Sequence, residues 1–402
     1  MKRFLNYAFF LCFILPASAE WEFGERTSIA PDDKAKQVFH HLDASGRANI
    51  AVSDNTIAVI WEDNHSGSPQ AYVAFKTIAD KQFRPPLQVS TGTEAYEPSI
   101  TTMGHGQFLM GWEQDSKVWL RTGTMQQLAP AQRASTKEAR QISLTSISDK
   151  LAIAAWAQQA GRFSQIVTAS ISLNSKIANI DPAIAIDPKP PAHDQCYPVL
   201  ASTNDNITLV WEDRRRGHTM LLQSHKEGKK PFAPFKVLNE IVKKSSKYGS
   251  GSGVTRAALA RCDGQHLLAT WMDKRNRQTG YDIYAAQSVD KGKHFGTNES
   301  VQDSFGENIA QWNPAVSCDA RGNKLIAWYD NRDESMDILL TWKTTDGWSE
   351  DMPVSPASGE GEQTNAAITL DKHGDLHMVW IDQAKSGAPT GLYYAVAKKQ
   401  NE

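Results

Sequence analysis

The chain has 402 residues, with 43 Lys and Arg against 45 Asp and Glu, and therefore a formal net charge of -2. This balance excludes a strongly basic surface of the kind that binds nucleic acid. A hydrophobic content of 40% is typical of a soluble globular protein. The length would allow two or three ordinary domains, but an internal repeat overrides that estimate.

The N-terminus has the three parts of a secretory signal peptide. Lys2 and Arg3 precede an apolar run from Phe4 to Leu15, and Ala17-Ser18-Ala19 forms a cleavage site of small residues. The apolar run is too short to remain as a membrane anchor. The sequence therefore predicts a signal peptide over residues 1–19 and a single mature domain over residues 20–402. It also predicts a periplasmic or secreted protein with no transmembrane segment in the mature chain.

A short apolar run that ends in Trp, usually followed by an acidic residue, recurs seven times. The tryptophans are spaced about 44 to 60 residues apart and are Trp61, Trp112, Trp156, Trp211, Trp271, Trp328 and Trp380. A period of this size, filled with short alternating strands, is typical of a β-propeller with one blade per repeat. The sequence predicts an all-β, seven-bladed propeller whose repeated Trp belongs to the core.

Each repeat is predicted to contain four strands. In the sixth repeat these are 314–318, 324–328, 337–341 and a fourth that follows Trp348, with Gly and Asp between them. The fourth strand carries an aromatic residue six positions before an aliphatic one, as in Phe295 and Val301. The last repeat has no such strand, but Phe23 and Ile29 repeat the spacing near the N-terminus. The N-terminal strand is therefore expected to complete the last blade and close the ring.

The segment from Ser288 to Phe295, SVDKGKHF, resembles the Asp box of the sialidase-like (BNR repeat) propellers. Looser copies occupy the same turn near Gly228 and near Gly347. The WEDRR, WMDKR and WYDNR segments also look like bacterial members of that superfamily. The resemblance implies a propeller fold, with six blades as the alternative because sialidases usually have six. The box is a turn motif, so it carries little information about activity.

The mouth of a propeller channel lies where the innermost strands begin, and this is where ligands usually bind. The residue at that point is polar or amphipathic in all seven repeats: Arg47, Glu97, Gln141, Tyr197, Arg256, Asn313 and Asn365. Tyr96, Asp194, Gln311, Trp312 and Gln363 lie beside these positions. A Lys-rich loop over residues 238–253 is either a solvated connection or a basic flap over the mouth. We expect the mouth to bind a polar ligand.

Two classes of function fit this mouth. The first is a binding or scaffold protein for a glycan or a cell-envelope protein; an acidic sugar would use Arg47 and Arg256, with Trp312 as a stacking face. The second is a glycan-cleaving hydrolase or lyase. The resemblance implies three arginines, a Tyr nucleophile activated by Glu, and an Asp acid for sialidase chemistry. Here Tyr197, Glu97 and Asp194 are the candidates, but a third arginine is missing, so the sequence favours binding over catalysis.

Acidic residues follow five of the tryptophans by two positions: Asp63, Asp213, Asp273, Asp330 and Asp382. They are expected to hold turns or to pair with Arg215, Arg275 and Arg332. A calcium site is the alternative, and otherwise no cofactor or metal is predicted. The mature chain has three cysteines, Cys196, Cys262 and Cys318. This number is compatible with one disulfide and one free thiol, or with three thiols. Cys262 and Cys318 occupy similar places in adjacent repeats, which are expected to lie too far apart to pair.

Overall fold

The computed structural model describes residues 20–30, 37–174, 177–189, 191–240, 253–275, 280–303 and 309–400. Two sequence predictions fall outside these ranges. They are the signal peptide, and the central part of the Lys-rich loop over residues 241–252. No helix in the described part of the chain is long and apolar enough to cross a membrane.

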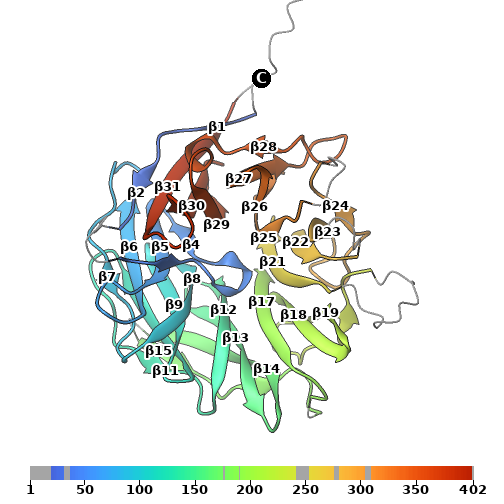
Figure 1. Cartoon of the computed structure of the whole chain (residues 1–402). Coiled ribbons are helices and arrows are strands. Elements are labelled where there is room, and N and C mark those ends of the chain that lie inside the picture. Colours follow the sequence, from blue (N-terminus) through green and yellow to red (C-terminus); the bar gives the residue numbers. More distant parts are fainter. Residues whose placement is uncertain are drawn as a thin grey trace, which may run out of the picture.

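Seven antiparallel sheets surround a central axis in chain order, which confirms the seven-bladed propeller and excludes six blades (Figure 1). Blade 1 contains β3 (His40–His41) and β4 (Ile50–Ser53) on the inside, then β5 (Thr56–Asp63), β6 (Gln70–Thr77) and β7 (Leu87–Gln88). Blade 2 contains β8 (Ala95–Gly104), β9 (Gln107–Gln114), β10 (Lys117–Thr124) and β11 (Gln132–Arg133). Blade 3 contains β12 (Ala139–Ser148), β13 (Leu151–Ala160), β14 (Phe163–Asn174), β15 (Ile177–Ile180) and β16 (Ile184–Ala185).

The remaining four blades repeat this order from the channel outward. Blade 4 contains β17 (Gln195–Thr203), β18 (Asn206–Arg216), β19 (His218–Glu227) and β20 (Lys236–Val237). Blade 5 contains β21 (Thr255–Arg261), β22 (Leu267–Asp273), β23 (Asp282–Ser288) and β24 (Glu299–Ser300). Blade 6 contains β25 (Trp312–Cys318), β26 (Lys324–Asp333), β27 (Ser335–Trp342) and β28 (Met352–Pro353). Blade 7 contains β29 (Glu362–Leu370), β30 (Leu376–Gln383), β31 (Thr390–Lys399), and the N-terminal β1 (Trp21–Phe23) and β2 (Thr27–Ser28).

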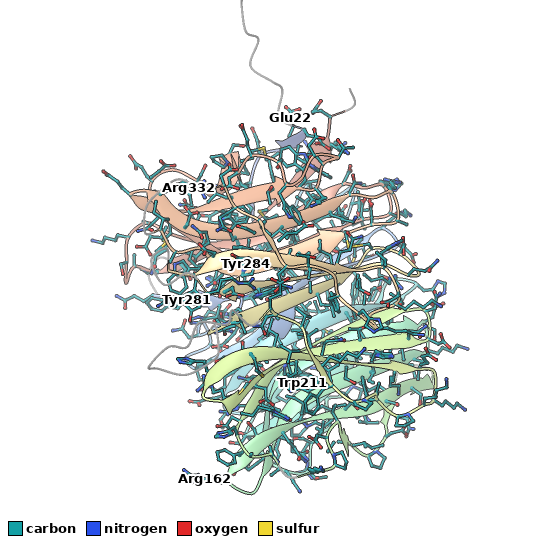
Figure 2. All side chains as sticks on the ribbon, turned by 90° about the vertical axis from the view of Figure 1, so that its right-hand side faces the viewer. Glu22, Arg162, Trp211, Tyr281, Tyr284 and Arg332 are labelled. Carbon is teal, nitrogen blue, oxygen red and sulfur yellow. A yellow bond between two sulfur atoms is a disulfide. The ribbon has the colours of Figure 1, made fainter. Side chains whose placement is uncertain are left out.

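The repeated tryptophans are core residues, as predicted, because each is at most 1% exposed. Each lies on the second strand of its blade; Figure 2 shows Trp211 within the body of its blade. In blades 1, 5 and 6 the indole N–H donates to the Asp two residues later, at 2.7 Å for Trp61 and Asp63. The carboxylate thus satisfies a buried donor that apolar packing alone would leave unpaired.

The N-terminal strand closes the ring. β1 pairs with β31, with Trp21 opposite Lys399 and Phe23 opposite Ala397. The Ile29 amide then donates to the Leu392 carbonyl at 2.9 Å. The aliphatic residues of the predicted fourth-strand signature make the same bond to the third strand of their own blades, as Val301 does to Ile283. Ile29 is 5% exposed and Val301 is 2% exposed, so the spacing marks a core position.

Deleting Trp21 to Ile29 should lower the melting temperature and cause aggregation, because β31 would become an open edge. The point variant Trp21→Ala should cost roughly 3 kcal/mol, since it empties a site that is 2% exposed. Glu22→Ala, an exposed neighbour on β1, is the matched control. Thermal unfolding by circular dichroism measures all three, and a deletion that melts like the wild type would refute the closure.

A disulfide joins Cys262 and Cys318, with 4.6 Å between their Cα atoms. The expectation that these positions lie too far apart was wrong. Both cysteines are at the ends of the innermost strands of blades 5 and 6, where neighbouring strands converge on the axis. Cys196, partly buried, is the free cysteine in the described part of the chain.

The segment from Ser288 to Phe295 forms the turn after β23, as its resemblance to the Asp box implied. The Asp290 carboxylate accepts from the Ser288 hydroxyl at 2.9 Å and from the His294 amide at 3.0 Å. Gly292 has φ +79°, and a Cβ there would lie 1.7 Å from Thr208 Oγ1 in blade 4. The motif therefore fixes a turn and packs two blades together, on the face opposite the channel mouth.

Blade 1 differs from the others because its innermost strand is interrupted. Between β3 and β4 the chain leaves the sheet and forms the 3-10 turn η1 (Ser45–Arg47), which lies close to the innermost strands of the other six blades. Leu42 is 0% exposed and Asn49 is 0% exposed. Residues 42–49 therefore fill the centre of the channel at its mouth end; this segment is called the plug below.

Gly46 allows the plug to approach blade 4. It has φ +67°, and a Cβ there would lie 2.7 Å from Val199 Cγ1. Gly46→Ala should cost about 1–3 kcal/mol through overpacking and backbone strain. Adding Val199→Ala should relieve the clash but not the strain, so the double variant should lose less than the sum of the two single losses. Additive losses in chemical denaturation would show that Gly46 does not pack against Val199.

Candidate functional site

All seven residues predicted at the channel mouth share one backbone conformation. Arg47, Glu97, Gln141, Tyr197, Arg256, Asn313 and Asn365 have positive φ values, from 46° at Glu97 to 61° at Gln141. We call them the mouth ring. Side chains other than Gly are strained in this region, at a cost of order 1 kcal/mol each. One strained residue per blade, at the same position in each, marks the mouth as the place where the fold departs from regular geometry.

The strain comes from a β-bulge in the innermost strand. The register of blades 2 to 7 shifts at this point, for example between Tyr96 and Ser99 in blade 2. In blade 1 the plug replaces the bulge, and Arg47 comes from η1. A bulge leaves one residue unpaired and redirects its side chain. Each blade therefore contributes one such residue at the channel mouth.

Carboxylates of the preceding blade hold several of these bulges. The Glu97 amide donates to Glu62 at 3.2 Å, and the Arg256 amide donates to Glu212 at 2.8 Å. Glu113 accepts from the amide of Gln141 at 2.5 Å in the same way. These glutamates directly follow Trp61, Trp112 and Trp211. These glutamates were not predicted from the sequence, although the repeated Trp-Glu pair was the available signal.

Side chains of the mouth ring also bind one another. Arg47 Nη2 donates to Asn365 Oδ1 at 2.6 Å, and Asn313 Nδ2 donates to the same oxygen at 2.9 Å. Arg47 Nη1 donates to the Leu42 carbonyl of the plug at 2.6 Å. Opposite this group, the Arg256 guanidinium lies 4.6 Å from the centre of the Tyr197 ring. Arg47 is thus buried and engaged, whereas Arg256 and Tyr197 are partly exposed.

Burial of the glutamates raises their pKa values. The pKa of Glu97 rises to about 8, first because of burial and then because of the nearby Glu113 carboxylate, while Arg256 opposes the rise. Burial likewise raises the pKa of Glu113 and of Glu62 to about 7. Carboxyl groups with a pKa near neutrality can donate as well as accept hydrogen bonds, or act as general acids. Burial also raises the pKa of the Tyr197 hydroxyl, and Arg256 opposes that change.

Residues predicted beside the ring have more varied roles. Asp194 accepts from the amide and hydroxyl of Ser164 at 2.9 and 3.0 Å, and these bonds lower its pKa. Trp312 packs edge-on against Tyr281, with 5.4 Å between ring centres. Tyr96 is exposed and donates its hydroxyl to Glu94 at 2.6 Å. Gln311 is buried, and its Nε2 donates to the Ile309 carbonyl.

Four of the five acidic residues two positions after the tryptophans hold turns, as expected, whereas Asp382 pairs with Arg26. Asp273 accepts from the backbone amide of Arg275 at 2.8 Å and pairs with its guanidinium at 2.6 Å. Asp213 and Asp330 do the same with Arg215 and Arg332; Figure 2 shows Arg332 on the side of the molecule where Tyr281 also lies. Calcium binding at these residues stays a prediction. In the described ranges, no group of three or more His, Cys, Asp or Glu side chains is arranged to hold a metal ion.

No protein-family model and no curated protein matches this chain. Among solved structures it is similar to a PL25 ulvan lyase bound to a glucuronate and sulfated rhamnose disaccharide unit, with a TM-score of 0.61, 9% identity, and coverage of 91% of this chain and 94% of that chain. It is also similar to the GH93 α-L-arabinofuranosidase of Fusarium graminearum, with a TM-score of 0.53, 10% identity, and coverage of 94% and 98%. A Hadza microbial sialidase aligns at a TM-score of 0.47 with 12% identity, over 85% and 73%. At these identities, the likeness to the first two proteins shows a shared fold.

Stability should fall as pH rises from about 4.5 to about 8. Glu97, Glu113 and Glu62 keep their protons to a higher pH in the folded state than in the unfolded chain, so the folded state binds more protons in this window. Glu97→Gln should flatten the dependence. Glu94→Gln, an exposed acid three residues earlier, is the control. Melting temperatures at stepped pH test this, and parallel curves for wild type and Glu97→Gln would contradict it.

Proposed function

We propose that the channel mouth binds a glycan and that the protein acts as a binding propeller rather than as a glycan-cleaving enzyme. The mouth ring carries this proposal. Each of the seven blades has one residue with a strained, positive-φ backbone at the mouth, and this residue presents a polar or amphipathic side chain. Such strain is typical of functional sites. Amide, guanidinium, carboxyl and phenol groups together suit the alternating donors and acceptors of sugar hydroxyls.

The engagement of Arg47 supports binding over sialidase chemistry. Its guanidinium already donates hydrogen bonds to the Leu42 carbonyl and to Asn365. Arg256 is therefore the guanidinium of the mouth ring that can bind a ligand. A three-arginine clamp for a sugar carboxylate therefore lacks two of its members within the ring. A neutral sugar fits this arrangement better than an acidic one.

A glycan hydrolase or lyase is the second candidate. It is favoured by the raised pKa values of Glu97 and Glu113. Glu97 also interacts electrostatically with the Tyr197 hydroxyl and with Arg256. Carboxyl groups poised near neutrality are the usual general acids of glycan cleavage. The similar ulvan lyase and arabinofuranosidase are glycan-cleaving enzymes by their descriptions.

We further infer that the protein is exported, periplasmic or secreted, and belongs to the sialidase-like (BNR repeat) propellers. The signal-like residues 1–19 and the Cys262–Cys318 disulfide support export, because disulfides persist in oxidising compartments. The Asp290 turn supports the superfamily. A cell-envelope protein as partner stays a prediction. Intact mass of the protein from a periplasmic fraction would test the cleavage after Ala19.

Calorimetry against neutral and acidic oligosaccharides tests the mouth. Arg256→Ala should weaken binding of the best ligand about 10-fold or more, since charge-assisted hydrogen bonds contribute roughly 1.5–3 kcal/mol. Arg261→Ala, at the other end of the same strand and exposed, is the matched control. Equal affinity in wild type and Arg256→Ala would contradict the proposal that the mouth binds the glycan.

Tyr197→Phe separates binding from catalysis. A binding protein should keep its affinity within a few-fold, because the hydroxyl is one contact among several. An enzyme that uses this hydroxyl should lose nearly all turnover. Product release from the bound oligosaccharide is followed by mass spectrometry for both proteins, and turnover that Tyr197→Phe abolishes would replace the binding proposal with the enzymatic one.

A further inference from the structure

A concave feature lies at the seam between blades 6 and 7. It is a groove of about 1240 Å³, bounded by the connection between β1 and β2, by residues 355–360 after β28, and by the loop from β30 to β31. β1 and β28 mark this part of the ring in Figure 1. Its walls come from three segments that are far apart in sequence, and the N-terminal segment supplies one of them.

The start of β29 links the groove to the mouth ring along the chain. Gln363 lines the groove and lies two residues before Asn365 of the mouth ring. Its side chain is 2% exposed, and its Nε2 donates to the Glu360 carbonyl at 3.1 Å. Its Oε1 has no hydrogen-bond partner within the described ranges. A buried acceptor without a partner costs about 1–3 kcal/mol, so this atom marks a place where a donor from a ligand would stabilise the protein.

The chemistry of the lining disfavours an acidic ligand. The described lining residues include three carboxyl groups, Glu25, Glu360 and Asp382, and one guanidinium, Arg26. Arg26 is already engaged, because Nη1 lies 2.6 Å from Asp382 Oδ2 and its Cζ lies 4.5 Å from the centre of the Tyr393 ring. The free carboxylates are acceptors, as is Gln363 Oε1. The groove therefore suits a neutral ligand with many hydroxyl donors.

We infer that this groove binds the continuation of a neutral glycan chain whose end occupies the channel mouth. The inference rests on the proposed function and adds that the ligand is an oligosaccharide or polysaccharide running from the mouth ring to the rim between blades 6 and 7. Hydroxyl groups along the chain donate to Gln363 Oε1 and to Glu360.

The length dependence of binding tests this inference. Calorimetry compares the trimers and hexamers of neutral xylo-, manno- and gluco-oligosaccharides with oligogalacturonate and a Lys-rich peptide. The hexamer that binds should bind at least tenfold more tightly than its trimer. Ala384→Trp, on the exposed loop after β30, should fill the groove and abolish this gain while leaving trimer affinity unchanged. Ala320→Trp, on an exposed turn of the opposite face, is the matched control.

A second variant removes a hydrogen-bond acceptor from the groove instead of filling it. Glu360→Ala should weaken hexamer binding several-fold and leave the trimer unaffected, with exposed Glu350→Ala as its control. Two results would contradict glycan binding in the groove while the mouth proposal stands. They are equal affinities for trimer and hexamer, and hexamer binding that Ala384→Trp leaves unchanged. Peptide binding that is sensitive to Glu360→Ala, without glycan binding, would also overturn it. A protein that binds no oligosaccharide would overturn both.

Discussion

The pairing of the N-terminal strand with β31 is the interaction on which the architecture depends. Six blades are built from consecutive chain, and each packs its faces against its neighbours. The seventh takes its outer strand from β1 and β2, far from β31 in sequence, so the ring closes only when these segments pair. This exchange converts seven small sheets, each too small to be stable alone, into one closed structure without long open edges. It also places the N-terminal segment in the wall of the groove.

Within the ring, the bulges at the mouth link fold to function. A regular strand would point alternate side chains into the two neighbouring blade interfaces. In blades 2 to 7 the bulge instead frees one residue, and the glutamates after Trp61, Trp112 and Trp211 bind three of the freed amides. Burial of the same carboxylates raises their pKa values. The glutamates that hold the bulges are therefore also carboxyl groups with raised pKa values.

The plug gives this mouth a floor. Because residues 42–49 occupy the centre of the channel, a ligand at the mouth meets a closed surface of side chains rather than an open tunnel. The plug also draws Arg47 into hydrogen bonds with Leu42 and Asn365. An arginine that would be a carboxylate ligand in an open ring is here part of the scaffold. Under the proposed function, this favours a neutral sugar over an acidic one.

The sequence alone determined the number of blades, the buried Trp, the closing strand and the seven positions of the mouth ring. All of these follow from local periodicity, because each repeat is a separate hairpin unit with the same pattern. The tertiary structure decided what depends on distances between blades. It paired Cys262 with Cys318, because inner strands converge at the axis, and it folded residues 42–49 into the channel. It also gathered Glu62, Glu97 and Glu113, whose shared burial no single repeat can encode. The groove depends on residues 23–26 lying beside 355–360, a contact that only ring closure creates.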